Sequence, residues 1–188
     1  MRKAAIALVH HPVLGRQGEV LTTTLTNLDM HDLARCARTY ALTASFIVHP
    51  LSAQQLLAKR ILAHWVDGAG GKRIPDRAEA LGLTRLVASL DEARAELGDD
   101  CEVWTTAARG EGALTGYAEA RERLREAGPP VLIVFGTGWG LARSVIDAAE
   151  LRLAPIDGVT NTEGEAYNHL SVRAACAITL DRLFSTTR

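Results

Sequence analysis

The sequence has few cysteines, few aromatic residues and no excess of either charge. There are three cysteines, Cys36, Cys101 and Cys176. They lie far apart in apolar surroundings and lack the spacing of a zinc site. This pattern excludes a disulfide framework and predicts reduced thiols without a metal. The 21 basic and 22 acidic residues give a net charge of -1. A strongly basic nucleic-acid-binding domain is therefore excluded, and any nucleic acid must bind to a local patch.

Long hydrophobic runs are also absent. No apolar stretch approaches the ~18 residues of a membrane-spanning helix. The apolar run at residues 4–9 ends at His10, His11 and Pro12, without the small-residue cleavage site of a secretory signal. We therefore expect a cytoplasmic protein without a membrane partner. The length of 188 residues predicts one domain, 1–188, with a sizeable core.

Strand-like and helix-like segments alternate along the chain. This alternation predicts an α/β fold, a mostly parallel sheet with helices on both faces. Segments 68–75 and 157–165 are rich in glycine or polar residues and are expected to be the loosest. Strands are predicted near 4–9, 45–48, 84–88, 101–105, 131–135 and 152–154, and helices near 28–41, 53–66, 90–97, 115–127, 141–150 and 169–184.

The most informative segment is 131–141. Five apolar residues predict a buried parallel strand, and Gly136, Gly138 and Gly140 follow at alternate positions. Bare backbone at the carboxyl end of such a strand lets a ligand approach closely. No lysine follows as in a P-loop, and Leu141 stands where the dinucleotide fingerprint needs its third glycine. The segment predicts another kind of ligand, the alternative being a glycine-rich turn that binds nothing.

Two helices carry further signals. Thr26 and Asp29 predict a capped start for the first helix, which places Arg35 and Arg38 together on one face. These arginines either bind nucleic acid or pair with neighbouring acids, and the basic residues at 59–60 and 72–77 pose the same alternative. The final helix is apolar on nearly its whole circumference, so we expect it to be buried, in a dimer interface or threaded through the fold. Asn168 is its predicted N-cap.

Four segments together resemble a known family. They are Asn27–Thr39, Trp104–Arg109, Phe135–Gly140 and Tyr167–Ala175. In this order and spacing they resemble the SPOUT-class RNA methyltransferases, in particular a stand-alone bacterial group that uses S-adenosylmethionine and has no defined substrate. The resemblance implies a C-terminal trefoil knot, a homodimer formed through the C-terminal helix region, and an RNA partner, either tRNA or rRNA, with no role for DNA.

The resemblance also implies the site residues. Arg35 matches the family's motif arginine beside the acceptor and would be catalytic. Its pKa, above ~12, makes phosphate binding an easier role than proton removal. Backbone groups would hold the adenine, and the bare Gly138 would keep the pocket clear. The implied S-adenosylmethionine-binding residues are Thr106, Ala107, Phe135, Gly136, Thr137, Gly138, Gly140, Ile156, Asn168, His169, Leu170 and Ser171.

The sequence departs from the family pattern at two places. Ala107 replaces the serine of a Thr-Ser-Ala-Arg segment that ends at Arg109, and residues 168–171 differ from the segment typical of ribose methyltransferases. Ribose 2'-O and guanine N1 therefore both remain open as acceptors. Candidate bases are Asp29, His31, Glu165 and His169. His10 and His11 either face the acceptor or are satisfied loop residues, and Trp139 either packs or stacks on a base.

Two functions other than catalysis remain possible from the sequence. One is a non-catalytic RNA-binding or regulatory module that retains the knotted fold. The other is a small-molecule-binding α/β protein unrelated to RNA, which predicts no cofactor contact at residues 167–171.

Overall fold

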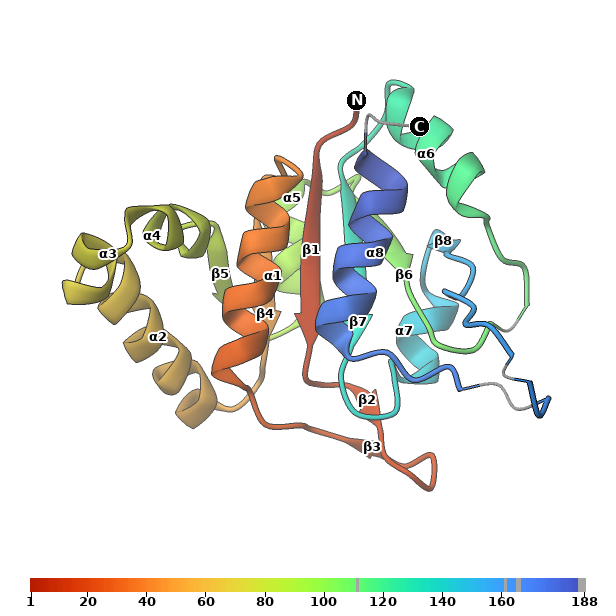
Figure 1. Cartoon of the computed structure of the whole chain (residues 1–188), viewed down its shortest axis with the longest axis horizontal. Helices are drawn as coiled ribbons and strands as arrows, with labels where there is room; N and C mark the ends of the chain where they lie inside the picture. The colour runs from red at the N-terminus through yellow and green to blue at the C-terminus, as the bar shows by residue number, and fades with distance from the viewer. Residues whose placement is uncertain (111, 161, 165–166, 186–188) are drawn as a thin grey trace.

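A six-stranded parallel sheet forms the centre of the molecule. The computed structural model describes residues 1–110, 112–160, 162–164 and 167–185. The strand order is β5-β4-β1-β7-β6-β8, and every pairing within this sheet is parallel, as predicted (Figure 1). The strands are β1 (Ala4–Val9), β4 (Ser45–Val48), β5 (Thr84–Val87), β6 (Glu102–Thr105), β7 (Val131–Gly136) and β8 (Leu151–Arg152).

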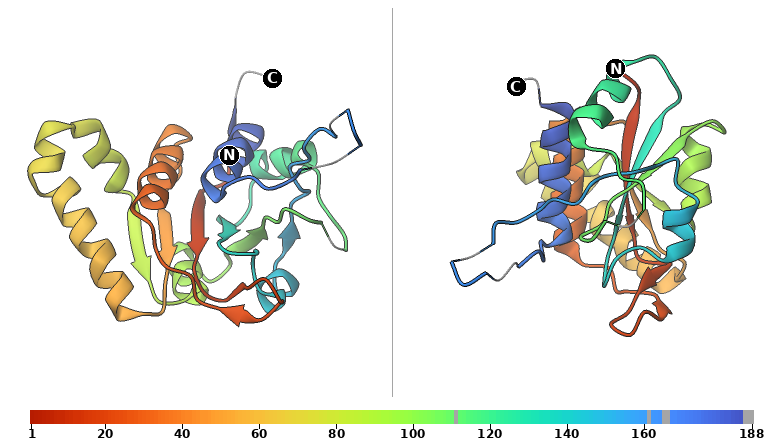
Figure 2. Two further views of the ribbon diagram at one scale, coloured as in Figure 1. Left: turned by 60° about the horizontal axis from the view of Figure 1, so that its bottom comes forward. Right: turned by 90° about the vertical axis from the view of Figure 1, so that its right-hand side faces the viewer.

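Helices cover both faces of the sheet, which confirms the predicted layers (Figures 1 and 2). The helices α1, α2, α6 and α8 pack on one face, and α5 and α7 pack on the other. The bounds are α1 (Asn27–Thr39), α2 (Ser52–Val66), α3 (Ala69–Arg73), α4 (Pro75–Leu81), α5 (Leu90–Leu97), α6 (Tyr117–Arg125), α7 (Arg143–Asp147) and α8 (Val172–Phe184).

The central strand β1 is buried at all six residues. Its side chains alternate between the two faces, so that Ile6 and Leu8 join the core under α1 and α8. Ala7 and Val9 join the core under α5 and α7. Burial on both faces explains why β1 and β7 appear in the sequence as continuous apolar runs.

Segment 68–75 is better ordered than expected, because it contains α3 and the start of α4. Tertiary packing supplies the reason. A Cβ on Gly70 would lie 2.8 Å from the Trp65 ring, and a Cβ on Gly71 would lie 2.4 Å from the Trp65 carbonyl oxygen. The Arg77 guanidinium lies 4.9 Å from the centroid of the same ring. Glycine, which disfavours an isolated helix, here permits a close helix–helix contact.

The sequence analysis predicted neither α3 nor α4, and it also did not predict a small antiparallel hairpin. It consists of β2 (Val13–Leu14) and β3 (Val20–Leu21) and lies between β1 and α1. The sequence pattern that indicates this hairpin is too short to stand out: it consists of two apolar pairs separated by a segment that contains Gly15 and Gly18.

The final helix differs from its prediction at its start. It begins at Val172, and Ser171 is the N-cap whose side chain accepts a hydrogen bond from the Ala174 N–H, so the assignment of Asn168 as N-cap was wrong. In this single chain only Cys176, Thr179, Leu180 and Leu183 are buried, and most of the other residues of α8 are half-buried. The helix packs on α1 and α6 and contacts β7.

Two further expectations concern cysteines and membranes. Cys36, Cys101 and Cys176 are free thiols, as predicted. None of the helices among the described residues has the length and apolar character needed to cross a membrane. The trefoil knot implied by the resemblance concerns the path of residues 155–171, which include gaps in the described chain, and it stays a prediction.

Candidate active site

The predicted cofactor segments, far apart in sequence, come together at the carboxyl ends of β6 and β7. The Asn168 side-chain amide donates a hydrogen bond to the Ala108 carbonyl oxygen at 3.0 Å. The His169 ring lies edge-on to Trp139, with 5.9 Å between ring centroids. A Cβ on Gly158 would lie 3.1 Å from the Tyr167 carbonyl oxygen. The loops after β6, β7 and β8 and the segment before α8 therefore form one neighbourhood.

This neighbourhood borders the point where the sheet changes direction. The strands β1 and β7 are adjacent, but the chain continues from β1 to β4 on one side and from β7 to β8 on the other. In open α/β sheets, ligands bind outside the carboxyl ends of the strands at such a switch point. The topology thus favours a ligand site at the loop that follows β7.

The glycines of that loop have identifiable structural reasons. Gly138 and Gly140 have positive φ angles of 62° and 108°. A Cβ on Gly136 would lie 2.6 Å from the Leu141 nitrogen, and one on Gly138 would lie 2.9 Å from the Leu14 carbonyl oxygen. The expectation that Gly138 keeps a ligand pocket clear was therefore wrong, because its bare Cα faces the β2–β3 hairpin. A Cβ on Gly140 would meet open space.

Backbone donors are available where the segments meet. In the part of the chain that the structure describes, the N–H groups of Ala107, Ile156 and Leu170 form no hydrogen bond. Exposed apolar side chains lie in the same group of loops, since Trp139 is 54% exposed and Leu170 is 45% exposed. Neutral donors beside exposed apolar groups suit a neutral purine ring, which needs hydrogen bonds at its edge and contact on its faces. These residues fit the adenine of S-adenosylmethionine.

Four other predicted cofactor residues have structural partners instead. Both the N–H and the hydroxyl of Thr106 donate to the Val134 carbonyl oxygen, at 3.1 and 2.9 Å. Phe135 is a core residue, Ser171 caps α8, and the Thr137 hydroxyl donates to the Val9 carbonyl oxygen at 3.0 Å. Their side chains hold the loops in place, so any ligand contact from them would come from the backbone.

The predicted catalytic residue, Arg35, lies on the exposed surface of α1. Its guanidinium is 3.9 Å from the Asp32 carboxylate, and no hydrogen bond or ion pair among the described residues joins it to the cofactor segments. The structure does not bring Arg35 to this site within one chain. Arg109 is exposed on the loop after β6, next to Ala108.

The candidate bases are in different environments. The Asp29 carboxylate lies 3.4 Å from Arg173 and accepts a hydrogen bond from the Thr26 hydroxyl. His31 is buried against Trp65, and burial lowers its pKa. His169 is exposed and lies between the rings of Trp139 and Tyr167. Of the three, His169 alone contacts the cofactor segments, and Glu165 lies outside the described residues.

His10 does not face an open site. Its ring is fully buried, stacks on His49 with 5.1 Å between centroids, and bonds through Nδ1 to the Thr23 hydroxyl at 2.9 Å. Burial, and secondarily the neighbouring His49, lowers its pKa to about 4, so the ring is neutral near pH 7. Thr23 and His49 were missed by the sequence analysis, because no local pattern marks them.

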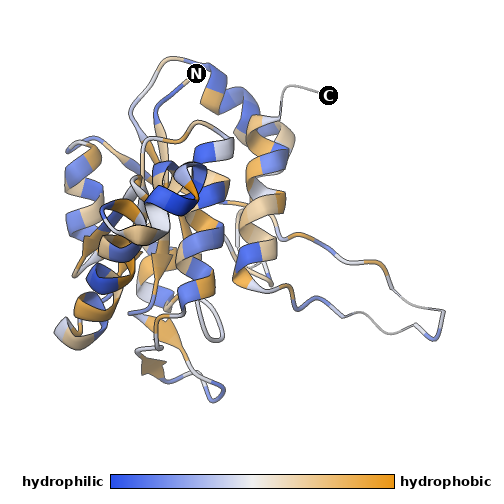
Figure 3. Cartoon of the chain, turned by 60° about the vertical axis from the view of Figure 1, so that its left-hand side comes forward, coloured by the Kyte–Doolittle hydropathy of each residue, from blue (hydrophilic) through white to orange (hydrophobic). Residues whose placement is uncertain are grey.

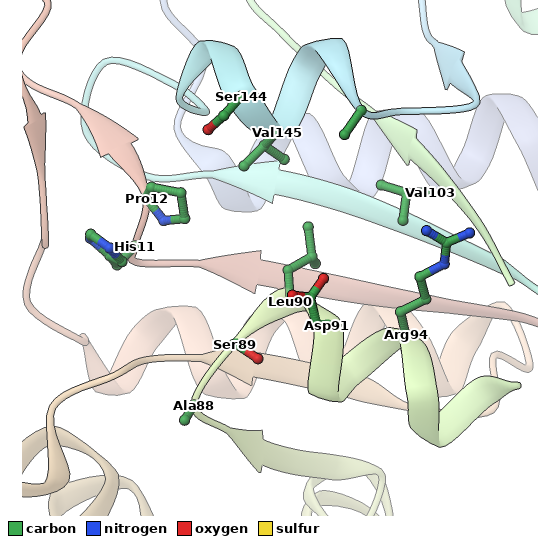
Figure 4. A pocket seen from close by; sticks show the side chains of 11 residues that line it. His11, Pro12, Ala88, Ser89, Leu90, Asp91, Arg94, Val103, Ser144 and Val145 are labelled. Atoms are coloured by element: carbon green, nitrogen blue, oxygen red, sulfur yellow. The ribbon is translucent and has the colours of Figure 1, made fainter. Parts of the chain in front are cut away.

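A cleft of about 270 Å³ lies on the opposite face of the sheet, between α5 and α7 (Figure 4). None of the predicted cofactor residues lines it. His11 lies at its edge and bonds through Nδ1 to the Thr22 hydroxyl at 3.1 Å. A second hollow, near Met1 and Gly128, lies beyond the amino ends of the strands. Neither hollow coincides with the predicted site.

The basic clusters also differ from one another. Arg38 pairs with Glu79 on α4 and is structural. By contrast, Lys59, Arg60, Lys72 and Arg73 are exposed, and within the described ranges none of them forms an ion pair. They lie on α2 and α3, in the helical arm that stands off the β5 edge of the sheet (Figure 2).

Comparisons with solved structures support the fold. TrmJ from Z. mobilis ZM4 matches with a TM-score of 0.60 at 18% identity, over all of this chain and 70% of the other. The A. aeolicus TrmH/SpoU tRNA modifying enzyme matches with a TM-score of 0.54 at 12% identity, over 97% and 74%. These similarities confirm the predicted SPOUT-type fold.

Sequence relatives are closer. The chain is 41% identical over 186 residues to a tRNA (guanine-N(1)-)-methyltransferase of Oleidesulfovibrio alaskensis, covering 97% of this chain but 42% of that protein. It therefore spans less than half the length of this relative, and the same holds for the corresponding Nitratidesulfovibrio vulgaris protein. An uncharacterized Aquifex aeolicus protein is 37% identical, over 97% of this chain and 89% of its own length.

The family model described as SAM-dependent RNA methyltransferase matches residues 3–185, nearly the whole chain. This match agrees with the SPOUT-type fold, the glycine loop at the switch point and the convergence of the cofactor segments. The chain therefore belongs to the family of S-adenosylmethionine-dependent RNA methyltransferases.

Proposed function

We propose that this protein transfers a methyl group from S-adenosylmethionine to a nucleotide of tRNA or rRNA. The observation that carries the proposal is the meeting of the loops after β6, β7 and β8 with residues 167–171 at the switch point of the sheet. When bound, S-adenosylmethionine supplies a methyl group that is already activated by its sulfonium. The protein then has to position the acceptor and remove any proton that must leave.

In this proposal the backbone donors of Ala107, Ile156 and Leu170 hold the adenine, and Trp139 and Leu170 contribute apolar surface. Thr106, Phe135, Thr137 and Ser171 fix the loops that carry these groups. Asn168 holds the segment before α8 against the loop after β6 through its bond to Ala108. A site of this kind needs no ionisable side chain to bind its cofactor.

The atom methylated is a finer part of the proposal. The names of the two relatives favour guanine N1, although each relative is more than twice as long as this chain. Methylation at N1 requires removal of a proton from the ring nitrogen. Among the described candidate bases, His169 is the one that lies beside the glycine loop, so we assign it this role.

A homodimer through the α8 region is also proposed. Val172, Ala175 and Ile178 are half-buried in the single chain, and Leu28 near the start of α1 is 59% exposed. A second copy that packs on α1 and α8 would cover this apolar surface. It would also bring its own residues next to Arg35, which offers a route for Arg35 to act at an acceptor site that it does not reach within one chain.

The helical arm α2–α4 is the proposed contact surface for RNA. Residues 52–81 contain five basic and three acidic residues, in a chain whose net charge is -1. None of the five cations has a carboxylate partner among the described residues. Arg77 lies over the Trp65 ring, and the other four are exposed and remain available for phosphates. RNA substrates also imply the cytoplasmic location expected from the sequence.

The test combines cofactor binding with methyl transfer. Calorimetry should show S-adenosylmethionine binding by the wild-type protein, and labelled methyl groups should pass to bulk tRNA or rRNA from a deletion strain. Mass spectrometry of nucleosides from that strain identifies the lost modification. Binding of RNA without any methyl transfer would instead favour the non-catalytic RNA-binding module, and failure to bind the cofactor would remove the proposal.

A further inference from the structure

Thr23, which is half-buried, is the centre of a polar network with two buried histidines at the carboxyl ends of β1 and β4. Its hydroxyl bonds to His10 Nδ1 at 2.9 Å and to the Thr137 hydroxyl on the glycine loop. Its carbonyl oxygen bonds to His49 Nε2 at 3.0 Å, and its N–H donates to the His10 carbonyl oxygen at 3.0 Å. One residue of the chain between β3 and α1 thus connects both histidines to the loop after β7.

The direction of every hydrogen bond in this network follows from proton counting. The Thr137 hydroxyl donates its one proton to the Val9 carbonyl oxygen, so it must accept from the Thr23 hydroxyl. The Thr23 oxygen must then accept from His10, which therefore carries its proton on Nδ1. His10 Nε2 is left as an unprotonated nitrogen, which agrees with the finding that this buried atom has no hydrogen-bond partner among the described residues.

His49 takes the opposite tautomer for a similar reason. Its Nδ1 accepts from the Leu51 N–H at 3.2 Å, so its proton is on Nε2 and is donated to the Thr23 carbonyl oxygen. Both rings are neutral, but they are opposite tautomers. His10 bonds to the hydroxyl of Thr23, and His49 bonds to its carbonyl oxygen. The Thr23 hydroxyl therefore has one available donor direction, toward Thr137.

The backbone of the hairpin holds the same loop. The Trp139 N–H donates to the Leu14 carbonyl oxygen at 3.0 Å, and the Leu14 N–H donates to the Gly140 carbonyl oxygen at 2.8 Å. The Ala142 N–H donates to the Pro12 carbonyl oxygen at 3.1 Å. The glycine loop is consequently fixed on one side by the hairpin and presents its other side, with Trp139, to residues 167–171.

We infer that Thr23, oriented by His10 and His49, is a positioning residue that sets the conformation of the glycine loop for binding S-adenosylmethionine. This inference rests on the proposed function, in which that loop forms part of the cofactor site. Thr23 does not touch the cofactor. It acts through Thr137, whose place in the loop fixes Gly136 and Gly138 on either side.

Three variants test this role by calorimetry with S-adenosylmethionine. Thr23→Val keeps the shape of the side chain but removes the hydroxyl, and it should weaken binding about tenfold or more, because it leaves the buried His10 N–H unpaired and releases Thr137. Thr23→Ser keeps the hydroxyl and should bind within about threefold of wild type. Thr24→Val is the matched control, because Thr24 is exposed and is not part of the network, and it should bind as wild type does.

The comparison separates positioning from general stability. If Thr23→Val folds and binds S-adenosylmethionine as tightly as wild type, or if Thr23→Ser binds as weakly as Thr23→Val, the inference is overturned. Long-range proton–nitrogen spectra provide a second measurement that needs no cofactor. They should show His10 protonated on Nδ1 and His49 on Nε2, and Thr23→Val should perturb both rings.

The two proposals can fail separately. A wild-type protein that shows the two histidine tautomers but does not bind S-adenosylmethionine would refute the proposed function, and with it the positioning role. A wild-type protein that binds the cofactor but shows His10 protonated on Nε2 would refute the inference alone.

Discussion

The carboxyl edge of the sheet has two halves, which differ in whether their polar groups are hydrogen-bonded within the protein. At the ends of β1 and β4, His10 and His49 are buried, and both are bonded to the half-buried Thr23. At the ends of β6 and β7, Ala107 and Leu170 keep unpaired N–H groups next to solvent in the described chain. The first half is closed within the protein, whereas the second is open to a ligand.

The exposed aromatic residues follow the same division. Trp139 is 54% exposed and Tyr167 is 81% exposed, both in the open half, and the segment that carries Tyr167 projects from the body of the molecule (Figure 3). Buried polar groups must be paired, because an unpaired one costs free energy, so their pairing indicates structure. Unpaired backbone donors beside exposed rings cost little in water and indicate recognition.

The largest expected effect comes from a substitution that disturbs the contact between the glycine loop and the β2–β3 hairpin. Gly138→Val places a branched side chain at a φ of 62°, with its Cβ 2.9 Å from the Leu14 carbonyl oxygen. We expect the free energy of unfolding to fall by about 3 kcal/mol and cofactor binding to be lost, because the loop can no longer lie against the hairpin. Urea unfolding measures the first effect and calorimetry the second.

Gly116→Ala is the control for this substitution, since a Cβ there meets no atom within 4 Å and its φ is -69°. It should be nearly neutral. A Gly138→Val protein with wild-type stability would show that the hairpin does not hold the loop.

Acid should lower the free energy of unfolding, because it protonates His10 in the closed half. The pKa of His10 is lowered from 6.5 to about 4 in the folded protein, so the unfolded chain binds more protons between these values. The stability contributed by the neutral ring is fully present above pH 6.5 and is lost as the pH falls toward 4. The loss is at most about 3 kcal/mol.

Urea unfolding between pH 4 and pH 7 measures this dependence, and His10→Asn, which keeps a donor but does not titrate, should flatten it. His49, which stacks on His10 and also has a pKa lowered by burial, remains in both proteins, so a pH dependence that persists in His10→Asn is attributed to His49. Identical slopes for wild type and His10→Asn would contradict the assignment.

Substitutions of Arg35 test whether the site in the open half needs this residue for methyl transfer. Arg35→Ala should lower methyl transfer by ~10²-fold and leave S-adenosylmethionine affinity nearly unchanged, because it removes a positioning group on the acceptor side. Arg35→Lys should restore little if a planar, two-point phosphate contact is required. Transfer assays and calorimetry measure the two effects.

Arg38→Ala is the control on the same helix, because Arg38 pairs with Glu79 and should affect stability only slightly. Full activity of Arg35→Ala would assign Arg35 to the exposed ion pair with Asp32, and Arg109 or His169 would become the next candidate.

The smallest expected effect concerns the arm, which lies beyond both halves. Lys72→Ser combined with Arg73→Ser should weaken tRNA binding severalfold at moderate salt. It should also reduce the slope of log Kd against log salt by about one for each cation that contacts a phosphate. The control is Arg123→Ser with Arg125→Ser, which removes the same charge from arginines that pair with Glu119 and Glu122. Equal slopes for the two double variants would exclude the arm as the RNA surface.

Sequence analysis predicted most of the fold and part of the site. It located all six strands of the main sheet, the Thr26 cap of α1 and the glycine loop, because each has a strong local pattern. Its expectation that α8 is buried in a dimer interface or threaded through the fold stays a prediction, since in one chain only four residues of the helix are buried. It missed α3 and α4, and α3 escaped because Gly70 and Gly71 are poor helix formers until Trp65 packs against them.

The sequence by itself determined the α/β class, the parallel strands and the glycine turn, because apolar periodicity and chain reversals depend on neighbours along the chain. Only the tertiary structure decided which turns meet. Thr23 and Thr137 are 114 residues apart, and Asn168 and Ala108 are 60 apart. Such pairs arise from the order of strands in the sheet, which sets which loops share an edge. For the same reason, only the folded chain reveals that Gly138 faces the hairpin and that His10 is buried in a network instead of lying at an open site.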